Sequence, residues 1–195
     1  MSPIASVHRC RHLGIPYDSG VPSGGRLSVI PVRIASLSVD SASNSPVVLL
    51  RRVDDAGDFL GDDVLPIWIG HAEAMAILLG IQGAEPPRPL THDLMRGMFE
   101  TFGFYLERVE ITRLEEGTFY AALVLRGEER RVVVDARPSD SMALAVRVGC
   151  PIVLAEEVWD EAAVVAHEGG ADEEQEVERF REFLEHVDPS DFTGH

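Results

Sequence analysis

The sequence contains no lysine: all 17 basic side chains among its 195 residues are arginine. It has two cysteines, Cys10 and Cys150, which are too few for a disulfide framework, so we expect reduced thiols and a cytoplasmic location. The uninterrupted apolar stretches, such as 74–79, are far shorter than the roughly 20 residues that cross a bilayer, so we expect no membrane span. Walker loops, dinucleotide fingerprints, zinc-knuckle spacings and serine-nucleophile elbows are also absent, which excludes the enzyme classes that depend on them.

Basic charge is scarce as well. The chain has 33 acidic side chains and a formal net charge of −16, which disfavours nucleic acid as a partner unless positive charge is locally concentrated. The charge is uneven along the chain: residues 156–195 account for −12 of it and residues 1–155 for −4. We interpret the acidic C-terminal part as a solvating or self-inhibiting appendage. The lack of lysine fits either a high-salt cytoplasm or a GC-rich genome, and the concentration of acid in one segment favours the second.

Hydrophobic periodicity between residues 29 and 154 predicts alternating strands and helices. The expected strands are 29–39, 46–53, 64–69, 106–114, 119–125, 130–135 and 152–154, and the expected helices are 72–79, 91–102 and 139–149. Thr91 is the expected N-cap of the second helix, and its apolar side is Leu94, Met98 and Phe102. In the first helix, Met75 and Leu78–Leu79 form the expected inward-facing stripe.

Two segments of the chain resemble each other at an offset of 67 residues: 73–80 reads Glu-Ala-Met-Ala-Ile-Leu-Leu-Gly and 140–147 reads Asp-Ser-Met-Ala-Leu-Ala-Val-Arg. Each follows three expected strands. This predicts a single α+β domain made of two βββα-like units with a mixed or antiparallel sheet. Chance is a serious rival explanation, because helix starts favour acids and buried helices favour Met and Ala.

Composition divides the chain into three parts. Residues 1–26 lack a regular pattern and predict a disordered N-terminal extension, residues 27–165 hold the folded domain, and residues 166–195 form an acidic helix and tail. Within the last part, residues 172–187 form the clearest amphipathic helix, with Val177, Phe180, Leu184 and Val187 on its apolar side. We expect this helix to pack on the domain or on a sister subunit.

Four motifs in the folded part resemble, in the same order, those of the bifunctional nuclease domain family. They begin at Leu65 (Leu-Pro-Ile-Trp-Ile-Gly-His-Ala-Glu-Ala), Glu85 (Glu-Pro-Pro-Arg-Pro-Leu-Thr-His-Asp-Leu), Gly117 (Gly-Thr-Phe-Tyr-Ala) and Asp135 (Asp-Ala-Arg-Pro-Ser-Asp-Ser-Met-Ala-Leu-Ala). The resemblance covers roughly residues 29–165. It implies an α+β domain, a homo-oligomer, and DNase and RNase activity with DNA or RNA as substrate, but it brings no established catalytic mechanism.

Two of these motifs contain residue types that suit phosphodiester chemistry. Phosphodiester hydrolysis needs an activated water, neutralisation of charge at phosphorus and a proton for the leaving group. Arginine binds phosphate, histidine transfers protons, and carboxylates hold Mg²⁺ or Mn²⁺. The predicted substrate-binding residues are Arg88, Thr91, Arg137 and Ser139. The predicted catalytic residues are His92, Asp93, Asp135 and Asp140, of which the three aspartates are also the candidate ligands of Mg²⁺ or Mn²⁺.

Structural explanations remain open for most of these residues. Thr91 and Ser139 suit helix caps, the first-turn aspartates suit the helix dipole, and Arg137 suits an ion pair with Asp135. If the duplication is real, Glu73 and His71 contribute a third part of the site. Two hypotheses follow: a metal-assisted cytoplasmic nuclease, and a non-catalytic oligomeric interaction or regulatory module in which the motifs are structural. Convergence of the two motif clusters in space favours the first.

Overall fold

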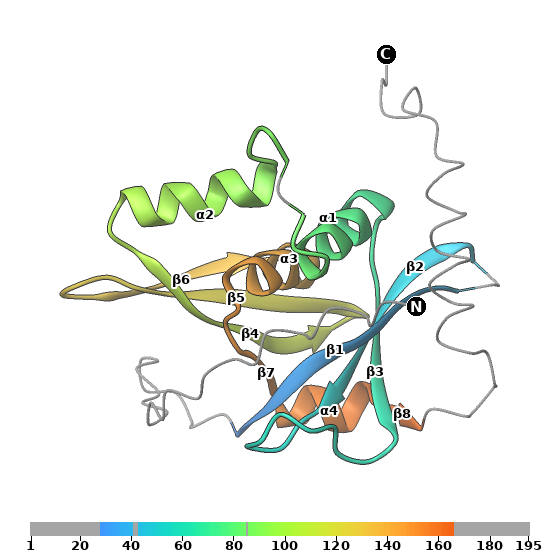
Figure 1. The fold of residues 1–195 in the computed structure, drawn as a ribbon. Helices are drawn as coiled ribbons and strands as arrows, with labels where there is room; N and C mark the ends of the chain where they lie inside the picture. Colours follow the sequence, from blue (N-terminus) through green and yellow to red (C-terminus); the bar gives the residue numbers. More distant parts are fainter. Residues whose placement is uncertain (1–27, 41–42, 85, 166–195) are drawn as a thin grey trace.

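The computed structural model describes residues 28–40, 43–84 and 86–165, so the expected N-terminal extension and the expected helix 172–187 lie outside the described residues. Figure 1 shows the element order along the chain. The strands are β1 (Val29–Asp40), β2 (Ser45–Arg52), β3 (Asp63–Trp68), β4 (Tyr105–Glu115), β5 (Thr118–Arg126), β6 (Arg131–Ala136), β7 (Ile152–Ala155) and β8 (Val164–Val165). The helices are α1 (His71–Ile81), α2 (Thr91–Thr101), α3 (Pro138–Val148) and α4 (Glu156–Ala162).

The strands form one mixed sheet in the order β6-β5-β4-β7-β1-β2-β3-β8. β1–β2–β3 and β4–β5–β6 are antiparallel meanders, and β7 lies between them, parallel to β4 and antiparallel to β1. Each meander is followed by a helix, α1 or α3. The predicted α+β domain with two βββα units is therefore confirmed, and α2 is the extra helix that joins them.

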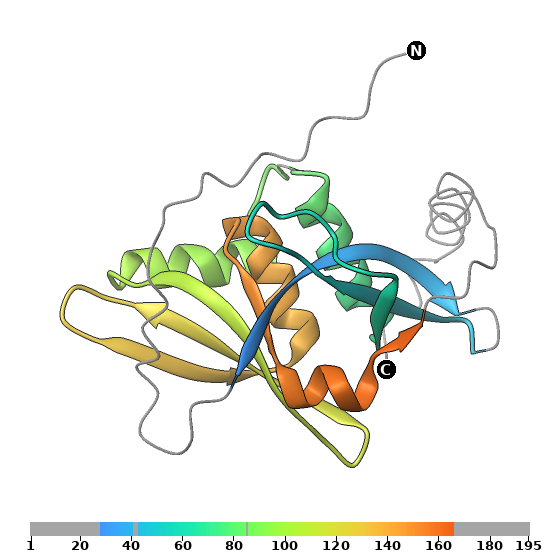
Figure 2. The ribbon, with the colours of Figure 1, turned by 90° about the horizontal axis from the view of Figure 1, so that it is seen from below.

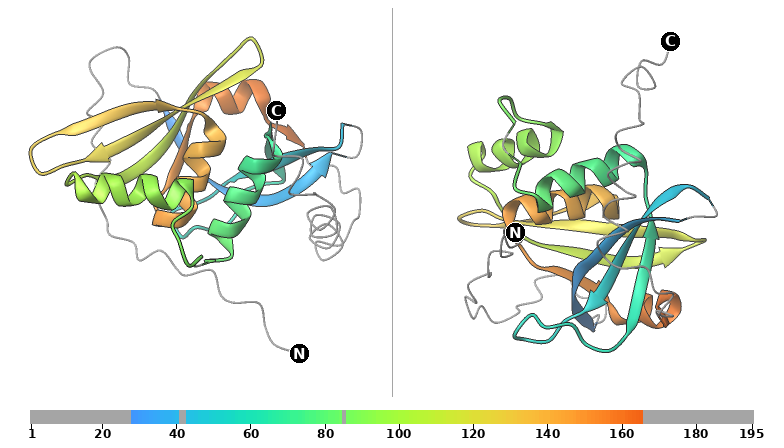
Figure 3. Two further views of the ribbon diagram at one scale, coloured as in Figure 1. Left: turned by 90° about the horizontal axis from the view of Figure 1, so that it is seen from above. Right: turned by 45° about the vertical axis from the view of Figure 1, so that its right-hand side comes forward.

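Three helices lie on one face of the sheet. α1 and α3 pack side by side, and α2 packs on α3 and β4 (Figures 1 and 3). α4 covers the opposite face, as the view from below shows (Figure 2). α4 and β8 are absent from the sequence prediction; α4 is only seven residues long, too short for a periodic pattern to identify. None of the described helices is long and apolar enough to cross a membrane.

Local irregularities lie where the sequence places them. β1 has a bulge between Ile34 and Ser36, next to the break in its alternating pattern. The β4–β5 hairpin turns on Glu116 and Gly117, both with positive φ, which a two-residue loop of this kind requires. Gly149 ends α3 in the left-handed conformation.

The helix faces, in contrast, correct two predictions. The inward-facing residues of α1 are Ala74 and Ile77 rather than the Met75 stripe, because the sheet lies under that side. The predicted apolar side of α2 points to solvent: Leu94, Met98 and Phe102 are 56%, 47% and 68% exposed. Spacing identifies a helix face, but only the tertiary structure decides which face is covered.

Thr91 is the first residue of α2 and its N-cap is Leu90, so the predicted Thr91 cap is wrong. α3 begins one residue earlier than predicted, with Pro138 in its first turn and Arg137 as the N-cap. The cap explanation offered for Ser139 therefore fails too, since Ser139 lies inside the helix and is buried.

Candidate functional site

The site is built from acids in the first turns of the two equivalent helices α1 and α3. Glu73 is the third residue of α1 and Asp140 the third residue of α3, in agreement with the offset in the sequence. Acids are favoured there because the unpaired N–H groups of a helix start carry partial positive charge. The Glu73 carboxylate lies so close to Gly70 that a Cβ on Gly70 would approach its Oε2 to 2.2 Å and displace the carboxylate.

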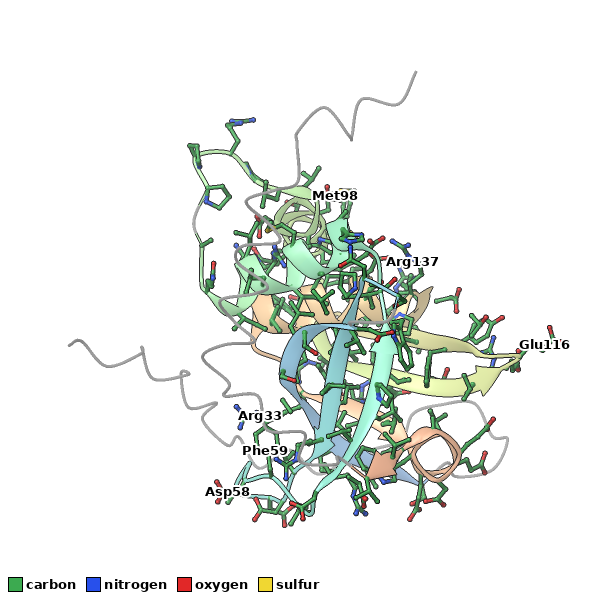
Figure 4. The ribbon with its side chains drawn as sticks, turned by 90° about the vertical axis from the view of Figure 1, so that its right-hand side faces the viewer. Arg33, Asp58, Phe59, Met98, Glu116 and Arg137 are labelled. Carbon is green, nitrogen blue, oxygen red and sulfur yellow. The ribbon has the colours of Figure 1, made fainter. Side chains whose placement is uncertain are left out.

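Arg137 joins the two acids. Its Nη2 lies 2.9 Å from Oε1 of Glu73, and its Nε donates to Oδ2 of Asp140 at 2.8 Å. The structural explanation predicted Asp135 as the ion-pair partner of Arg137. The structure instead pairs Arg137 with Glu73 and Asp140. The Arg137 side chain is 65% exposed, and these bonds use two of its three nitrogens. Figure 4 shows Arg137 at the surface of the molecule, where an anion can reach it.

His92, from α2, completes this group. Its Nε2 lies 3.2 Å from Oδ1 of Asp140, and only 8% of the residue is exposed. Asp140 thus accepts bonds from Arg137 and His92 at its two oxygens. The two motif clusters of the sequence meet at this contact, and Glu73 joins them from a third motif. We call Glu73, His92, Arg137 and Asp140 the helix-start cluster.

The charged neighbours of Asp140 in the helix-start cluster stabilise its ionised carboxylate. Burial raises the pKa of the Asp140 carboxyl, but hydrogen bonds and charge from Arg137 and His92 outweigh it, so the pKa lies below its ordinary value. The same contact with Asp140 raises the pKa of Arg137. Asp140 is therefore an anion at neutral pH, which suits it to orient a histidine.

Asp93 belongs to a separate contact between α2 and α3. Its Oδ1 accepts from Nε of Arg147 at 2.9 Å, and its Oδ2 accepts from the backbone N–H of Leu90 at 3.0 Å. Arg147 also donates to the carbonyls of Ala76 and Ala143, so it ties all three helices together. Sequence reasoning missed Arg147, since a basic residue in the last turn of a helix is ordinary and nothing local marks its partner.

The remaining predicted residues lie outside the helix-start cluster. Arg88 and Thr91 are exposed, Arg88 on the connector before α2, and Asp135 is exposed on β6. Across the residues that the structure describes, no three His, Cys, Asp or Glu side chains are grouped so as to hold a metal ion. The aspartates Asp93 and Asp140 instead face arginines. This set of side chains does not fit Mg²⁺ or Mn²⁺.

A surface hollow lies elsewhere, at the tip of the β4–β5 hairpin. It is lined by Glu115, Glu116, Thr118 and Tyr120. Figure 4 shows Glu116 well apart from Arg137. Two glutamates repel a phosphate, so the hollow is a poor candidate for a nucleic-acid site.

Comparison with known proteins agrees with the resemblance seen in the motifs. The profile of the bifunctional nuclease domain matches residues 48–167. An uncharacterized protein of Mycobacterium tuberculosis is 47% identical over 169 residues, which cover 84% of this chain and 98% of that protein. Bifunctional nuclease 1 of Oryza sativa is 29% identical over 116 residues, 58% of this chain and 33% of the rice protein. Bifunctional nuclease 1 of Arabidopsis thaliana is 24% identical over 110 residues, 55% of this chain and 32% of that protein.

The matched region contains every residue of the helix-start cluster and every element that positions it, apart from β1 and the first strand residues of β2. The match also covers more than half of the chain. The chain therefore belongs to the bifunctional nuclease domain family.

Proposed function

We propose that the chain hydrolyses phosphodiester bonds of nucleic acid and that the helix-start cluster is the reacting site. The observation that carries this proposal is the contact between His92 and Asp140, which joins two motifs separated by 48 positions. Family membership and the names of the plant relatives support a nuclease. The helix-start cluster is the candidate reacting site because it combines an exposed arginine with a histidine held by a carboxylate.

Each residue of the cluster has a role in this proposal. Arg137 binds the phosphate through the donors that Glu73 and Asp140 leave unused. When Nε2 of His92 donates to Asp140, its Nδ1 is left as the proton acceptor. Asp140 orients this imidazole, and Glu73 positions Arg137. The starts of α1 and α3 add backbone N–H groups that favour an anion.

Two side-chain contacts join α2 to α3: His92 with Asp140, and Asp93 with Arg147. Substitutions in each distinguish a catalytic role from a structural one. We expect His92→Gln and Asp140→Asn to lower the rate of oligonucleotide cleavage by about 100-fold or more, because positioned proton transfer contributes roughly that much. Arg147→Gln is the matched control: it breaks the other contact between the same helices, and we expect cleavage to fall less than about tenfold. Cleavage of single- and double-stranded substrates and thermal unfolding are measured for each variant.

A loss of cleavage that follows the loss of thermal stability, equal in all three variants, would show that the cluster is structural. A wild-type chain that cleaves no substrate with Mg²⁺, Mn²⁺ or EDTA would overturn the nuclease itself. The EDTA arm also tests metal assistance directly, since the proposed roles of Arg137 and His92 require no metal.

A further inference from the structure

We propose that Trp68 stacks on an unpaired base of the substrate, beside the phosphate that Arg137 binds, so that the site takes single-stranded nucleic acid. This inference rests on the proposed function and adds a specificity residue to it. Trp68 belongs to the first of the four sequence motifs, and the roles given to the helix-start cluster leave it unused. It is the last residue of β3, and α1 begins shortly after it at His71.

The indole of Trp68 faces away from the core. Side chains alternate along a strand, and Leu65 and Ile67 form the buried side of β3, so Trp68 points the other way and is 56% exposed. Tryptophan is highly buried on average in folded proteins, because its ring is large and mostly apolar. The exposed ring therefore offers a flat apolar surface to a ligand.

A hydrogen bond holds this ring in place. Nε1 of Trp68 donates to Oδ2 of Asp40, at the end of β1, at 3.3 Å. The same carboxylate oxygen accepts from the hydroxyl of Ser43 at 2.7 Å, which fixes the acceptor. Nε1–H is the only donor of an indole, so the polar group is already used and the rest of the ring is left for stacking. A ring that is oriented before the ligand arrives loses less entropy on binding.

A short path of contacts joins Trp68 to Arg137. Trp68 and Gly70 are two residues apart, and two residues span at most about 7 Å. The Glu73 carboxylate touches Gly70, since a Cβ there would lie 2.2 Å from its Oε2. The other oxygen of Glu73 lies 2.9 Å from Nη2 of Arg137. Trp68 is therefore close enough to contact a nucleotide next to the phosphate on Arg137.

Two other exposed aromatic side chains lie elsewhere. Phe59 lies well apart from Arg137 in Figure 4, and the guanidinium groups of Arg33 and Arg51 lie over its ring, 5.6 and 4.9 Å from its centroid. Tyr105 begins β4, beyond the end of α2 that is farther from the helix-start cluster. The position of Trp68 thus distinguishes it from aromatic residues that are merely exposed.

Stacking on Trp68 defines the substrate class. The bases of a duplex are paired and stacked on each other, so an indole on the protein surface reaches only a base that is unpaired. Every base has a π-face, so we expect little sequence preference. Stacking holds the substrate equally before and during the reaction, so it lowers KM and leaves kcat unchanged.

Substitution of the ring tests this role. We expect Trp68→Leu to raise KM for a single-stranded oligonucleotide at least about fivefold, with kcat changed less than about twofold. Trp68→Phe keeps an aromatic ring and should retain most of the affinity. Tyr105→Leu is the matched control, because it removes a ring that is 63% exposed at the other end of α2, and its KM should equal that of wild type.

Fluorescence tests the contact without cleavage. The chain has two tryptophans, and Trp159 is only 5% exposed, so a ligand that stacks on an indole changes the emission of Trp68. A single-stranded oligonucleotide should quench the emission of the His92→Gln variant, and a strand of the same length without bases should not. Adding Trp68→Phe to this variant should remove the quenching. The comparison of the two strands uses intact Trp68, so it holds even where a substitution there disturbs the fold.

The outcomes separate this inference from the proposed function. A wild-type chain that cleaves nucleic acid, with an unchanged KM in Trp68→Leu or with equal quenching by the strand without bases, would overturn the stacking role and leave the nuclease intact. Faster cleavage of a duplex than of a single strand would overturn the substrate class. A wild-type chain that neither binds nor cleaves any strand would overturn the stacking role and the nuclease together.

Discussion

At the scale of single residues, the helix-start cluster depends on one exposed arginine between two carboxylates. Arg137 holds Asp140 ionised against the cost of burial, and Asp140 holds His92. Arg137 and Asp140 are close in sequence, and Glu73 from α1 and His92 from α2 complete their contacts. The stability that this arrangement supplies must therefore depend on pH in a defined direction.

We predict that Arg137→Gln lowers the free energy of unfolding by about 0.5–1 kcal/mol at neutral pH, as for other partly exposed ion pairs. Asp140 has a lowered pKa in the folded chain, so its contribution is present above the ordinary aspartate pKa and is lost as the pH falls below about 4. The difference between wild type and Arg137→Gln should therefore shrink in acid. Urea unfolding at several pH values measures it.

Arg88→Gln is the control for this pH series, because Arg88 is exposed and forms no ion pair with the residues that the structure describes. Its effect should be small at every pH. If the difference in unfolding free energy between wild type and Arg137→Gln stays constant from pH 7 to pH 3, the coupling between Arg137 and Asp140 is contradicted.

At the scale of elements, α1 packs closely against α3 at Gly80. A Cβ there would lie 2.5 Å from Cγ2 of Val146 and 3.0 Å from Nη1 of Arg147. Arg147 is fixed by three acceptors from three helices, and the β-branched Val146 is stiff, so neither can yield easily. The packing of the two equivalent helices thus depends on a residue without a side chain.

We predict that Gly80→Ala destabilises the chain by about 1–3 kcal/mol, in spite of the better helix propensity of alanine. Gly97→Ala in α2 is the control, since its Cβ meets nothing within 4 Å in one chain, and it should stabilise by up to about 1 kcal/mol. Both are measured by urea unfolding of the full chain. Equal effects of the two substitutions would show that the contact at Gly80 is not tight.

At the scale of the whole molecule, the net charge of −16 is divided between a mildly acidic domain and a strongly acidic C-terminal part. Residues 166–195 carry −8 of it, which is half of the total on 30 residues. A nuclease must overcome this repulsion to bind its substrate. The acidic segment is thus expected to lower the affinity for nucleic acid.

We predict that a chain ending at Val165 binds a single-stranded oligonucleotide several-fold more tightly than the full chain at low salt. The difference should shrink as salt is added, because long-range repulsion between exposed charges is screened. Fluorescence anisotropy over a range of salt concentrations measures both effects. Equal or weaker binding by the shortened chain would contradict the self-inhibiting role of the segment.

The sequence by itself determined most of the elements of this protein and their order along the chain. Alternation, turn glycines and helix periodicity are local properties, so the bulge after Ile34, the hairpin at Gly117 and the two βββα units could be predicted. The motifs also placed His92, Arg137 and Asp140 among the candidate residues, because these residue types at helix starts are typical of an anion site.

The tertiary structure decided which of these features meet. No local pattern shows that Asp93 pairs with Arg147, 54 positions away, or that Asp140 rather than Asp135 holds Arg137. Nor does the spacing of Leu94, Met98 and Phe102 reveal that α3 and β4 cover the opposite side of their helix. Contacts between distant segments depend on how whole elements pack, and that packing is a property of the complete fold rather than of any one stretch of sequence.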